Sequence, residues 1–230
     1  MVDVAGNYRT ICSRINEAAA RAGRDPGTIK LLAAAKSQSI DRIRAAVAAG
    51  VTMIGENYVQ EAQETRLQVA QVVQWHMIGH LQRNKAKAAV ELFDVIESLD
   101  SVALARALEK EGAKRGKIIR TLIEVNLGGE ESKSGIPKDQ VRSLLEEVGE
   151  LSHVAVEGLM TVPPYREDSE NVRRFFRELN ELRERLGDWN LPNVGLKELS
   201  MGMTHDYPVA IEEGATIVRI GTALFGPRNQ

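Results

Sequence analysis

The chain has 230 residues, of which 43% are hydrophobic and 27% charged, a balance typical of a folded globular protein. It has 30 Lys and Arg residues and 32 Asp and Glu residues, a formal net charge of −2, so no basic field exists that would attract nucleic acid or an anionic membrane. Cys12 is the single cysteine, which excludes an intramolecular disulfide. The chain has neither a signal-like N-terminus nor an apolar run long enough for a membrane span. We therefore expect a cytoplasmic protein without nucleic-acid or membrane partners.

The expected elements alternate between helices and strands along the whole chain. An amphipathic helix over residues 3–21 comes first. Short apolar runs follow at intervals, and such near-continuous runs are typical of parallel strands buried on both faces. The eight runs are IKLLAAAK, VTMIGEN, VVQWHMIG, LFDVIES, KIIRTLIEVN, VAVEGLMTV, GLKELSMG and ATIVRIG.

Amphipathic stretches between the runs predict helices. One helix follows Ser39, a plausible N-cap, and ends at Gly50, a plausible left-handed C-terminal residue. Pro137 is expected in the first turn of a second helix. A third helix within residues 167–187 ends at Gly187. Eight strand–helix units favour a (β/α)8 TIM barrel with an extra N-terminal helix, as one domain over residues 1–230; an open doubly wound sheet is the alternative.

Polar residues gather where the expected strands end, which is where barrels of this kind carry function. Lys36 and Arg219 are notable because both follow apolar residues. Lys36 has three interpretations: a buried stem with its ammonium in water, the partner of a buried acid, or a nucleophilic amine. An apolar setting favours the neutral amine, which forms a Schiff base with an aldehyde or ketone. Spacing alone leaves the three open.

Two C-terminal segments, LSMGMTHD and RIGTALFG, follow the last two expected strands, where TIM barrels often bind phosphate. Ser200 and Thr222 offer hydroxyl groups. Gly202 and Gly221 allow backbone N–H groups to approach an anion, and a helical turn after Gly221 would add its dipole. Taken singly, each residue is explained by ordinary turn chemistry. A Schiff-base lysine facing a phosphate cradle describes one ligand well, pyridoxal 5′-phosphate.

Six segments carry a resemblance to a known family, in family order between Leu31 and Gly226. They are AAAKSQS, IGENYVQEA, QWHMIGHLQRNK, VNLGGEESKSG, GLMTVPP and LSMGMTHDYPVAIEEGATIVRIGTALFG. The chain resembles the pyridoxal phosphate homeostasis proteins, relatives of the fold-type III barrel domain of alanine racemase. The resemblance implies that Lys36 forms the internal aldimine with the cofactor and that Arg219 faces its pyridine nitrogen.

The resemblance also implies the rest of the cofactor site. It comprises phosphate contacts from Ser200, Gly221 and Thr222, backbone contacts near Gly202, and pocket walls formed by Asn57 and Met201. Three positions depart from the family pattern: Met77 replaces a more frequent phenylalanine, Thr204 a frequent serine, and Glu97 an expected histidine. The change at Glu97 puts any ligand contact of that histidine in doubt.

Two features favour binding over catalysis. An arginine at the pyridine nitrogen disfavours ring protonation and so weakens the electron sink, although alanine racemases also place arginine there. Racemases of this type carry a second domain with a tyrosine base, and the chain has no room for it after Gly226. Two-base racemisation needs an acid or base on each face of the substrate, and Lys36 serves only one.

We therefore expect a protein that holds and carries the cofactor, possesses no catalytic residue of its own, and acts as a monomer. It would deliver pyridoxal phosphate to apo-enzymes or influence amino-acid and keto-acid balance. A weak amino-acid racemase is the alternative; an aldolase of the Schiff-base type is disfavoured because its lysine commonly lies on a later strand.

Two further motifs resemble a metal site and a nucleotide-binding loop but lack a residue that each needs. His76 and His80 have the spacing of a zinc helix but lack the intervening glutamate, and His76 belongs to a strand, so no metal site is expected. GGEESKSG lacks the glycine that a nucleotide-binding loop needs before Lys-Ser. Lys133 in that segment is a solvated surface lysine, or else a second lysine that contacts or transfers the cofactor.

Overall fold

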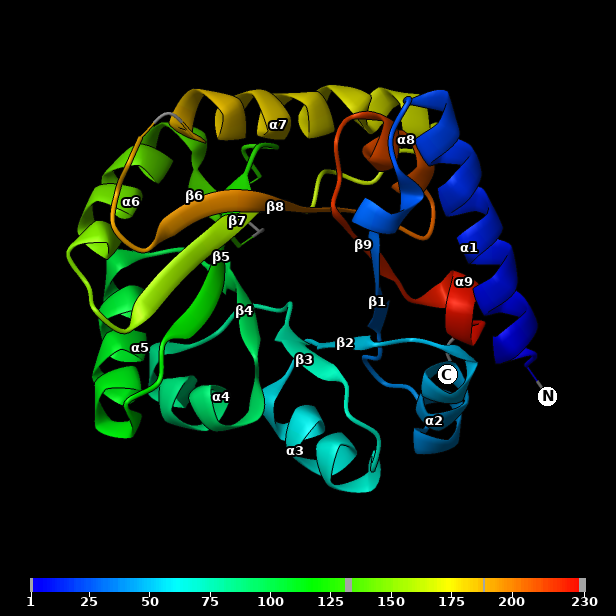
Figure 1. The fold of residues 1–230 in the computed structure, drawn as a ribbon, viewed down its shortest axis with the longest axis horizontal. Helices are drawn as coiled ribbons and strands as arrows, with labels where there is room; N and C mark the ends of the chain where they lie inside the picture. The colour runs from blue at the N-terminus through cyan, green and yellow to red at the C-terminus, as the bar shows by residue number, and fades with distance from the viewer. Residues whose placement is uncertain (1, 131–133, 188, 228–230) are drawn as a thin grey trace.

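Parallel strands form a closed ring at the centre of the protein (Figure 1). The computed structural model describes residues 2–130, 134–187 and 189–227. In this part of the chain the ring consists of β1 (Lys30–Ala34), β2 (Met53–Glu56), β3 (Gln74–Met77), β4 (Val95–Leu99), β5 (Ile119–Asn126), β7 (Val154–Met160), β8 (Val194–Met203) and β9 (Ile217–Ile220). Each strand pairs in parallel with the next, β9 pairs with β1, and β4 pairs with β5. The ring is thus a closed barrel, and the alternative of an open sheet is wrong.

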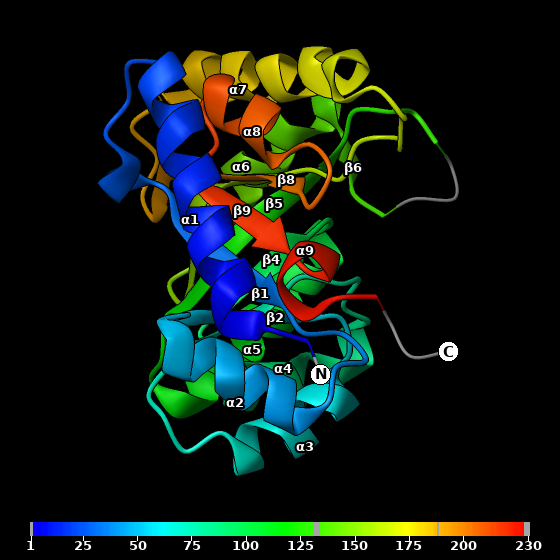
Figure 2. The ribbon, with the colours of Figure 1, turned by 90° about the vertical axis from the view of Figure 1, so that its right-hand side faces the viewer.

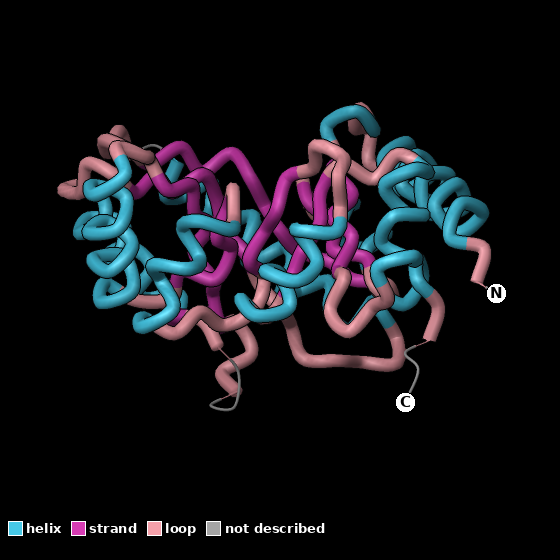
Figure 3. The backbone as a smooth tube through the Cα atoms, turned by 90° about the horizontal axis from the view of Figure 1, so that it is seen from below, coloured by secondary structure: helices cyan, strands magenta, loops and turns pink. Residues whose placement is uncertain are grey.

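Helices surround the ring on its outside, as Figure 1 and the view from below in Figure 3 show. In chain order they are α1 (Val4–Arg21), α2 (Ile40–Ala49), α3 (Val59–Gln68), α4 (Ala86–Leu92), α5 (Val102–Arg115), α6 (Val141–Gly149), α7 (Arg173–Gly187), α8 (Tyr207–Glu212) and α9 (Thr222–Phe225). The N-terminal helix α1 packs against α8, α9 and α2, and so lies beside the last helix of the chain (Figure 2). None of the described helices is both long enough and apolar enough to cross a membrane.

Every strand predicted from the sequence is present, and a few local details differ. A two-residue strand, β6 (Ile136–Pro137), extends the sheet beside β5 and was not predicted. Pro137 ends this strand and precedes a 3-10 turn, so it does not lie in the first turn of α6. Ser39 is the N-cap of α2, but its hydroxyl makes no capping hydrogen bond. Gly50 ends α2 in the left-handed region with φ 118°, as predicted.

Two apolar clusters hold the barrel together. The larger fills the space between strands and helices, where α7 contributes an apolar face through residues such as Phe176 and Leu179. The smaller lies inside the ring and takes one residue from each of six strands: Leu32, Met53, Val95, Leu122, Met160 and Ile217. Because side chains at i and i+2 share one face of a strand, the residues two positions further along also point inward. They form the next layer toward the carboxyl ends of the strands.

Candidate functional site

A cavity opens at the carboxyl ends of the strands, where the sequence predicts the site. Its volume is about 370 Å³. Its wall is made by Ala34, Lys36, Gln38, Asn57, Ile78, Val162, Tyr165, Met203, Thr204, His205, Arg219, Gly221 and Thr222. These residues come from β1, β8, β9, the first residue of α9 and the loops that follow six of the strands, so only the closed barrel brings them together.

Lys36 lies in a tight turn just beyond β1. The N–H of Gln38 donates to the carbonyl of Ala35 at 2.9 Å, which closes the turn. Ser37 has a φ of 59°, an uncommon left-handed conformation for a residue with a side chain, and its N–H donates to Glu61 Oε2 at 3.2 Å. The Lys36 Nζ lies 5.1 Å from the centre of the Tyr58 ring. The turn therefore places a primary amine on the cavity wall, in line with the inward face of β1.

Arg219 enters the cavity from β9 and is only 4% exposed. Its Nη2 donates to the carbonyl of Thr161 at 2.7 Å and its Nη1 donates to the Ser200 hydroxyl at 2.8 Å. Burial lowers the pKa of Arg219, while the nearby carboxylates of Glu97 and Glu124 act against that change. The guanidinium is thus fixed along one edge and still reaches the cavity.

The start of α9 forms the part of the cavity suited to an anion. Gly221 is the N-cap of this short helix and Thr222 its first residue. The first N–H groups of a helix have no intrahelical partner. The Ala223 N–H is capped by the Thr204 hydroxyl at 3.2 Å. A Cβ on Gly221 would meet nothing closer than the Ala34 carbonyl at 3.5 Å, so the glycine leaves free space at this wall.

The structure brings together five of the eight residues predicted for the site: Lys36, Asn57, Arg219, Gly221 and Thr222 all line the cavity. Asn57 is positioned by a close approach of two loops, because a Cβ on Gly79 would lie only 2.5 Å from the Asn57 carbonyl.

Three predicted residues lie elsewhere. The Ser200 side chain is buried below the cavity, where its hydroxyl donates to Glu97 Oε2 at 2.5 Å and accepts from Arg219. Met201 packs in the outer core, because a register shift between Ser200 and Met203 turns Met203 to the cavity instead. Gly202, with φ 89°, lies at that shift and packs against α8. The expected wall contact of Met201 is therefore absent. Lys133 lies outside the described residues.

Several residues of the site were not predicted. Tyr165 and His205 come from different loops, and their rings lie 5.6 Å apart at the cavity wall. Nothing local in the sequence marks such a pairing. Glu97 and Glu124 lie two positions after the inward-facing Val95 and Leu122, so strict alternation could have identified both. Burial, together with the charge of Asp100, raises the pKa of Glu124 to about 7.

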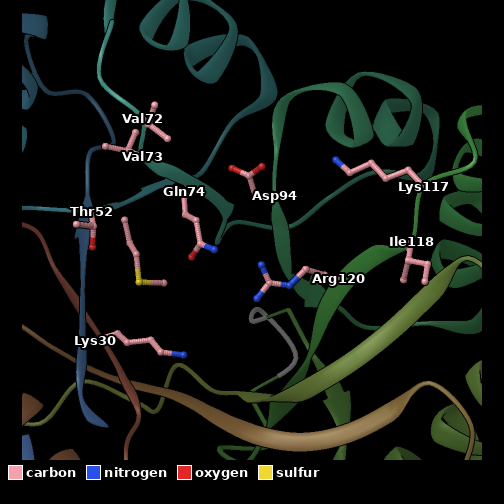
Figure 4. A pocket seen from close by; sticks show the side chains of 10 residues that line it. Lys30, Thr52, Val72, Val73, Gln74, Asp94, Lys117, Ile118 and Arg120 are labelled. Carbon is pink, nitrogen blue, oxygen red and sulfur yellow. The ribbon is translucent and has the colours of Figure 1, made fainter. Parts of the chain in front are cut away.

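A larger cavity of about 650 Å³ lies at the opposite end of the barrel (Figure 4). Figure 4 shows Lys30, Gln74 and Arg120 reaching toward its centre. Lys30 already pairs with Glu198 at 2.5 Å, and Arg120 makes two hydrogen bonds to Glu157. In TIM barrels this end supports stability, and the carboxyl end carries function. The smaller cavity is therefore the candidate site.

The fold and the cavity define a class: (β/α)8 barrels that present a lysine amine after the first strand and the start of a short helix after the last. The family of the alanine racemase N-terminal domain matches residues 7–229. The pyridoxal phosphate homeostasis protein of Aquifex aeolicus is 46% identical over 219 residues, which cover 95% of each chain. The protein of that name from Pseudomonas aeruginosa is 41% identical and covers 100% of this chain and 97% of its own.

A solved structure agrees with these relatives. PipY of Synechococcus elongatus, determined with PLP bound, superposes with a TM-score of 0.85 and is 33% identical. The match covers 97% of this chain and 100% of PipY. The chain belongs to the pyridoxal phosphate homeostasis protein family.

Proposed function

We propose that this protein binds pyridoxal 5′-phosphate in the cavity at the barrel mouth and holds it covalently through Lys36. The observation that carries the proposal is the presence of an amine, a guanidinium and an anion-binding helix start on one cavity wall. Pyridoxal phosphate has an aldehyde, a ring nitrogen and a phosphate, and each has a matching group here. Relatives named as pyridoxal phosphate homeostasis proteins, and PipY with PLP bound, support the assignment.

The residues divide the work of binding. When bound, the cofactor supplies an aldehyde, and condensation of that aldehyde with a primary amine forms a C=N bond and releases the oxygen as water. Lys36 supplies the amine, and Arg219 presents N–H donors from the cavity floor. Gly221 and Thr222 offer backbone N–H groups and a hydroxyl to the phosphate. No oxidant, reductant or metal is needed for this reversible attachment.

Arg219 favours storage of the cofactor over turnover. A fixed positive charge disfavours a proton on a nearby ring nitrogen, and an unprotonated ring withdraws electrons less strongly. We infer a carrier that keeps the reactive aldehyde bound and releases it to apo-enzymes, and that thereby influences amino-acid and keto-acid balance. Transfer to the apo form of a pyridoxal phosphate enzyme, measured as recovered activity, tests the carrier role. Recovery no faster than with the same concentration of free cofactor would contradict direct delivery.

Borohydride trapping tests the covalent attachment. We expect purified protein incubated with pyridoxal phosphate to turn yellow, and borohydride reduction to leave one cofactor on the peptide that contains Lys36. Lys36→Ala should abolish the adduct at that peptide. Peptide mass mapping gives the site and the stoichiometry.

Lys87→Ala is the matched control, because Lys87 is an exposed lysine of α4 that is not among the residues of the cavity wall. This variant should be labelled like the wild type. Full labelling of the Lys36→Ala protein would overturn the assignment of the lysine.

A second function, weak amino-acid racemisation, is favoured by one observation: Tyr165 and His205 line the same cavity as Lys36. Either ring could exchange a proton with a substrate on a face that Lys36 does not reach. His205 Nε2 donates to the Glu167 carbonyl at 2.6 Å, which restricts that ring. Steady-state assays with single amino acids test this function. Turnover that requires both Lys36 and Tyr165 would establish an enzyme.

A further inference from the structure

A chain of hydrogen bonds runs through the inside of the barrel beneath the cavity. His76 Nδ1 lies 2.6 Å from Glu97 Oε1, and Glu97 Oε2 lies 2.5 Å from the Ser200 hydroxyl. The Ser200 hydroxyl in turn accepts from Arg219 Nη1 at 2.8 Å. The first three residues are at most 1% exposed, and Arg219 is the member that reaches the cavity. We call these four residues the buried relay.

The donors and acceptors of the buried relay allow one consistent arrangement. An ionised Glu97 can only accept, so Nδ1 of His76 and the Ser200 hydroxyl both donate to it. The Ser200 oxygen then uses a lone pair for Arg219. His76 Nε2 is buried with no partner among the described residues, so the ring is held through Nδ1. Glu97 therefore accepts from both of its neighbours, and Arg219, which can only donate, sets the direction of the bond to Ser200.

The charges agree with this arrangement. Burial acts to raise the pKa of Glu97, but the interaction with His76, by hydrogen bond and by charge, prevails together with the charge of Arg219 and the hydrogen bond from Ser200, and the pKa is lowered. The carboxyl groups that act on Arg219 are those of Glu97, Glu124 and Asp206. Burial raises the pKa of both Glu124 and Asp206, so Glu97 is the member of this set whose ionised form is favoured.

Stability alone does not account for a buried carboxylate at position 97. Replacing a buried ionic group by well-packed apolar side chains is often neutral or stabilising. The preceding inward layer is apolar on six strands, including Val95 on the same strand as Glu97. An apolar residue at position 97 would extend this apolar interior by one layer. Glu97 instead connects through Ser200 to Arg219, a buried cation on the cavity wall.

We propose that Glu97 is a positioning residue for the cofactor: through Ser200 it fixes the Arg219 guanidinium at the cavity floor, and its charge balances the charge of Arg219. The inference rests on the proposed function and deepens it. Glu97 itself does not line the cavity, so its effect on the cofactor is exerted through Arg219.

Two substitutions separate the two parts of the role. Glu97→Gln keeps a side chain of the same shape that can still accept from Ser200, but it removes the charge. Glu97→Ala removes both. Glu56→Gln is the matched control: Glu56 is also a buried glutamate at the end of a barrel strand, and its neighbours are Glu61 and Thr65 of α3, outside the ring.

The experiment follows the visible absorption band of bound pyridoxal phosphate from pH 6 to 9 and measures the dissociation constant at one pH. In Glu97→Gln the less balanced charge of Arg219 should disfavour the protonated form of the bound chromophore. The midpoint of its colour change should then move to lower pH by about half a unit or more, as expected for one charge at partial screening. Glu97→Ala should show this shift and, in addition, bind the cofactor about tenfold more weakly. The weaker binding corresponds to the loss of the hydrogen bond from Ser200 to Glu97, which holds Arg219 in position.

The outcomes are distinguishable. Wild-type protein that forms no adduct on Lys36 would refute the proposed function, and the inference with it. An adduct in all proteins, with the same midpoint and affinity for wild type, Glu97→Gln and Glu97→Ala, would overturn the role of Glu97 alone. A shift of equal size in Glu56→Gln would show that replacing any buried glutamate at this end of the barrel has the effect, and would also overturn it. Thermal unfolding of each variant confirms that the proteins compared are folded, and the isosteric Glu97→Gln retains the test if Glu97→Ala does not fold.

Discussion

Thr222 offers an anion two hydrogen-bond donors, its hydroxyl and its backbone N–H. It is exposed on the cavity wall, it begins α9, and it carries both a hydroxyl and a backbone N–H that an anion can use. Its neighbour Ala223 has its N–H already capped by Thr204. The hydroxyl of Thr222 is therefore the side-chain donor of this helix start that remains for a phosphate.

Thr222→Val should weaken binding of pyridoxal phosphate by about 1.5–3 kcal/mol, or roughly 10- to 100-fold in the dissociation constant, because a hydrogen bond to a charged group is lost. Binding of pyridoxal, which lacks the phosphate, should hardly change. Thr222→Ser should restore most of the loss. Equal losses for both ligands would show that the hydroxyl acts on the shape of the loop and not on the phosphate.

The sequence predicts that a residue lies on the cavity wall where regular alternation along its strand is enough to place its side chain. Lys36 continues the inward face of β1 through Leu32 and Ala34, so alternation alone directs it to the barrel mouth. Met201 is the counterexample, because the register shift in β8 reverses the alternation beyond Ser200. A bulge depends on pairing with the neighbouring strand, which the local sequence does not reveal.

The close packing of α8 against β8 depends on one glycine, Gly202. Gly202 has φ 89°, and a Cβ there would lie 2.5 Å from the Ala210 Cβ and 2.9 Å from the Tyr207 Cα. Both atoms belong to α8, which packs directly behind the strand. A side chain at position 202 would therefore push α8 away from the barrel.

Gly202→Ala should destabilise the protein by about 2–4 kcal/mol, through left-handed strain and overpacking together. Gly116→Ala is the control: Gly116 has φ 59° but has nothing within 4 Å of a Cβ, so only the strain of about 1 kcal/mol applies. Chemical denaturation of the three proteins measures the difference. Equal losses for the two variants would show that contact with α8 is not limiting.

The segment before α6 is an element where the sequence pattern and the structure differ. The pattern ahead of α6 indicates a first-turn proline, but Pro137 pairs with β5 as part of β6. Pairing with a strand supplies backbone hydrogen bonds that a helical first turn would not, and propensity is a weak influence beside such tertiary contacts. The eight barrel strands, by contrast, are near-continuous apolar runs, a pattern typical of parallel strands buried on both faces.

For the whole molecule, pH acts on stability through buried carboxyl groups. Burial, with a contribution from the charge of Glu61, raises the pKa of Glu56 to about 8. Between its ordinary pKa and about 8, the folded state binds a proton at Glu56 that the unfolded state does not. The stabilisation is therefore complete below the unfolded pKa and is lost as the pH rises toward 8, by about 1.4 kcal/mol per pH unit.

Glu56→Gln removes this proton linkage, so the free energy of unfolding of the variant relative to wild type should rise by about 3–4 kcal/mol between pH 5 and pH 8. Glu124 titrates in both proteins and cancels from the comparison. Urea denaturation at the two pH values gives the difference. A constant difference between the proteins would show that Glu56 keeps its ordinary pKa in the folded state.

The amino-acid sequence is sufficient to predict the barrel, the N-terminal helix, and the position of Lys36, Arg219, Gly221 and Thr222 at one end of the barrel. These features follow from apolar periodicity and from the rule that parallel strands present their carboxyl ends together. The hydrogen bonds that hold Arg219 in place, by contrast, depend on the packed barrel. The bonds from His76 through Glu97 and Ser200 join side chains of β3, β4, β8 and β9, far apart in the chain, and closure of the ring brings them within hydrogen-bond distance. Direct contact of this kind depends on strand register and on the stagger of neighbouring strands, which are properties of the packed barrel and not of any one segment.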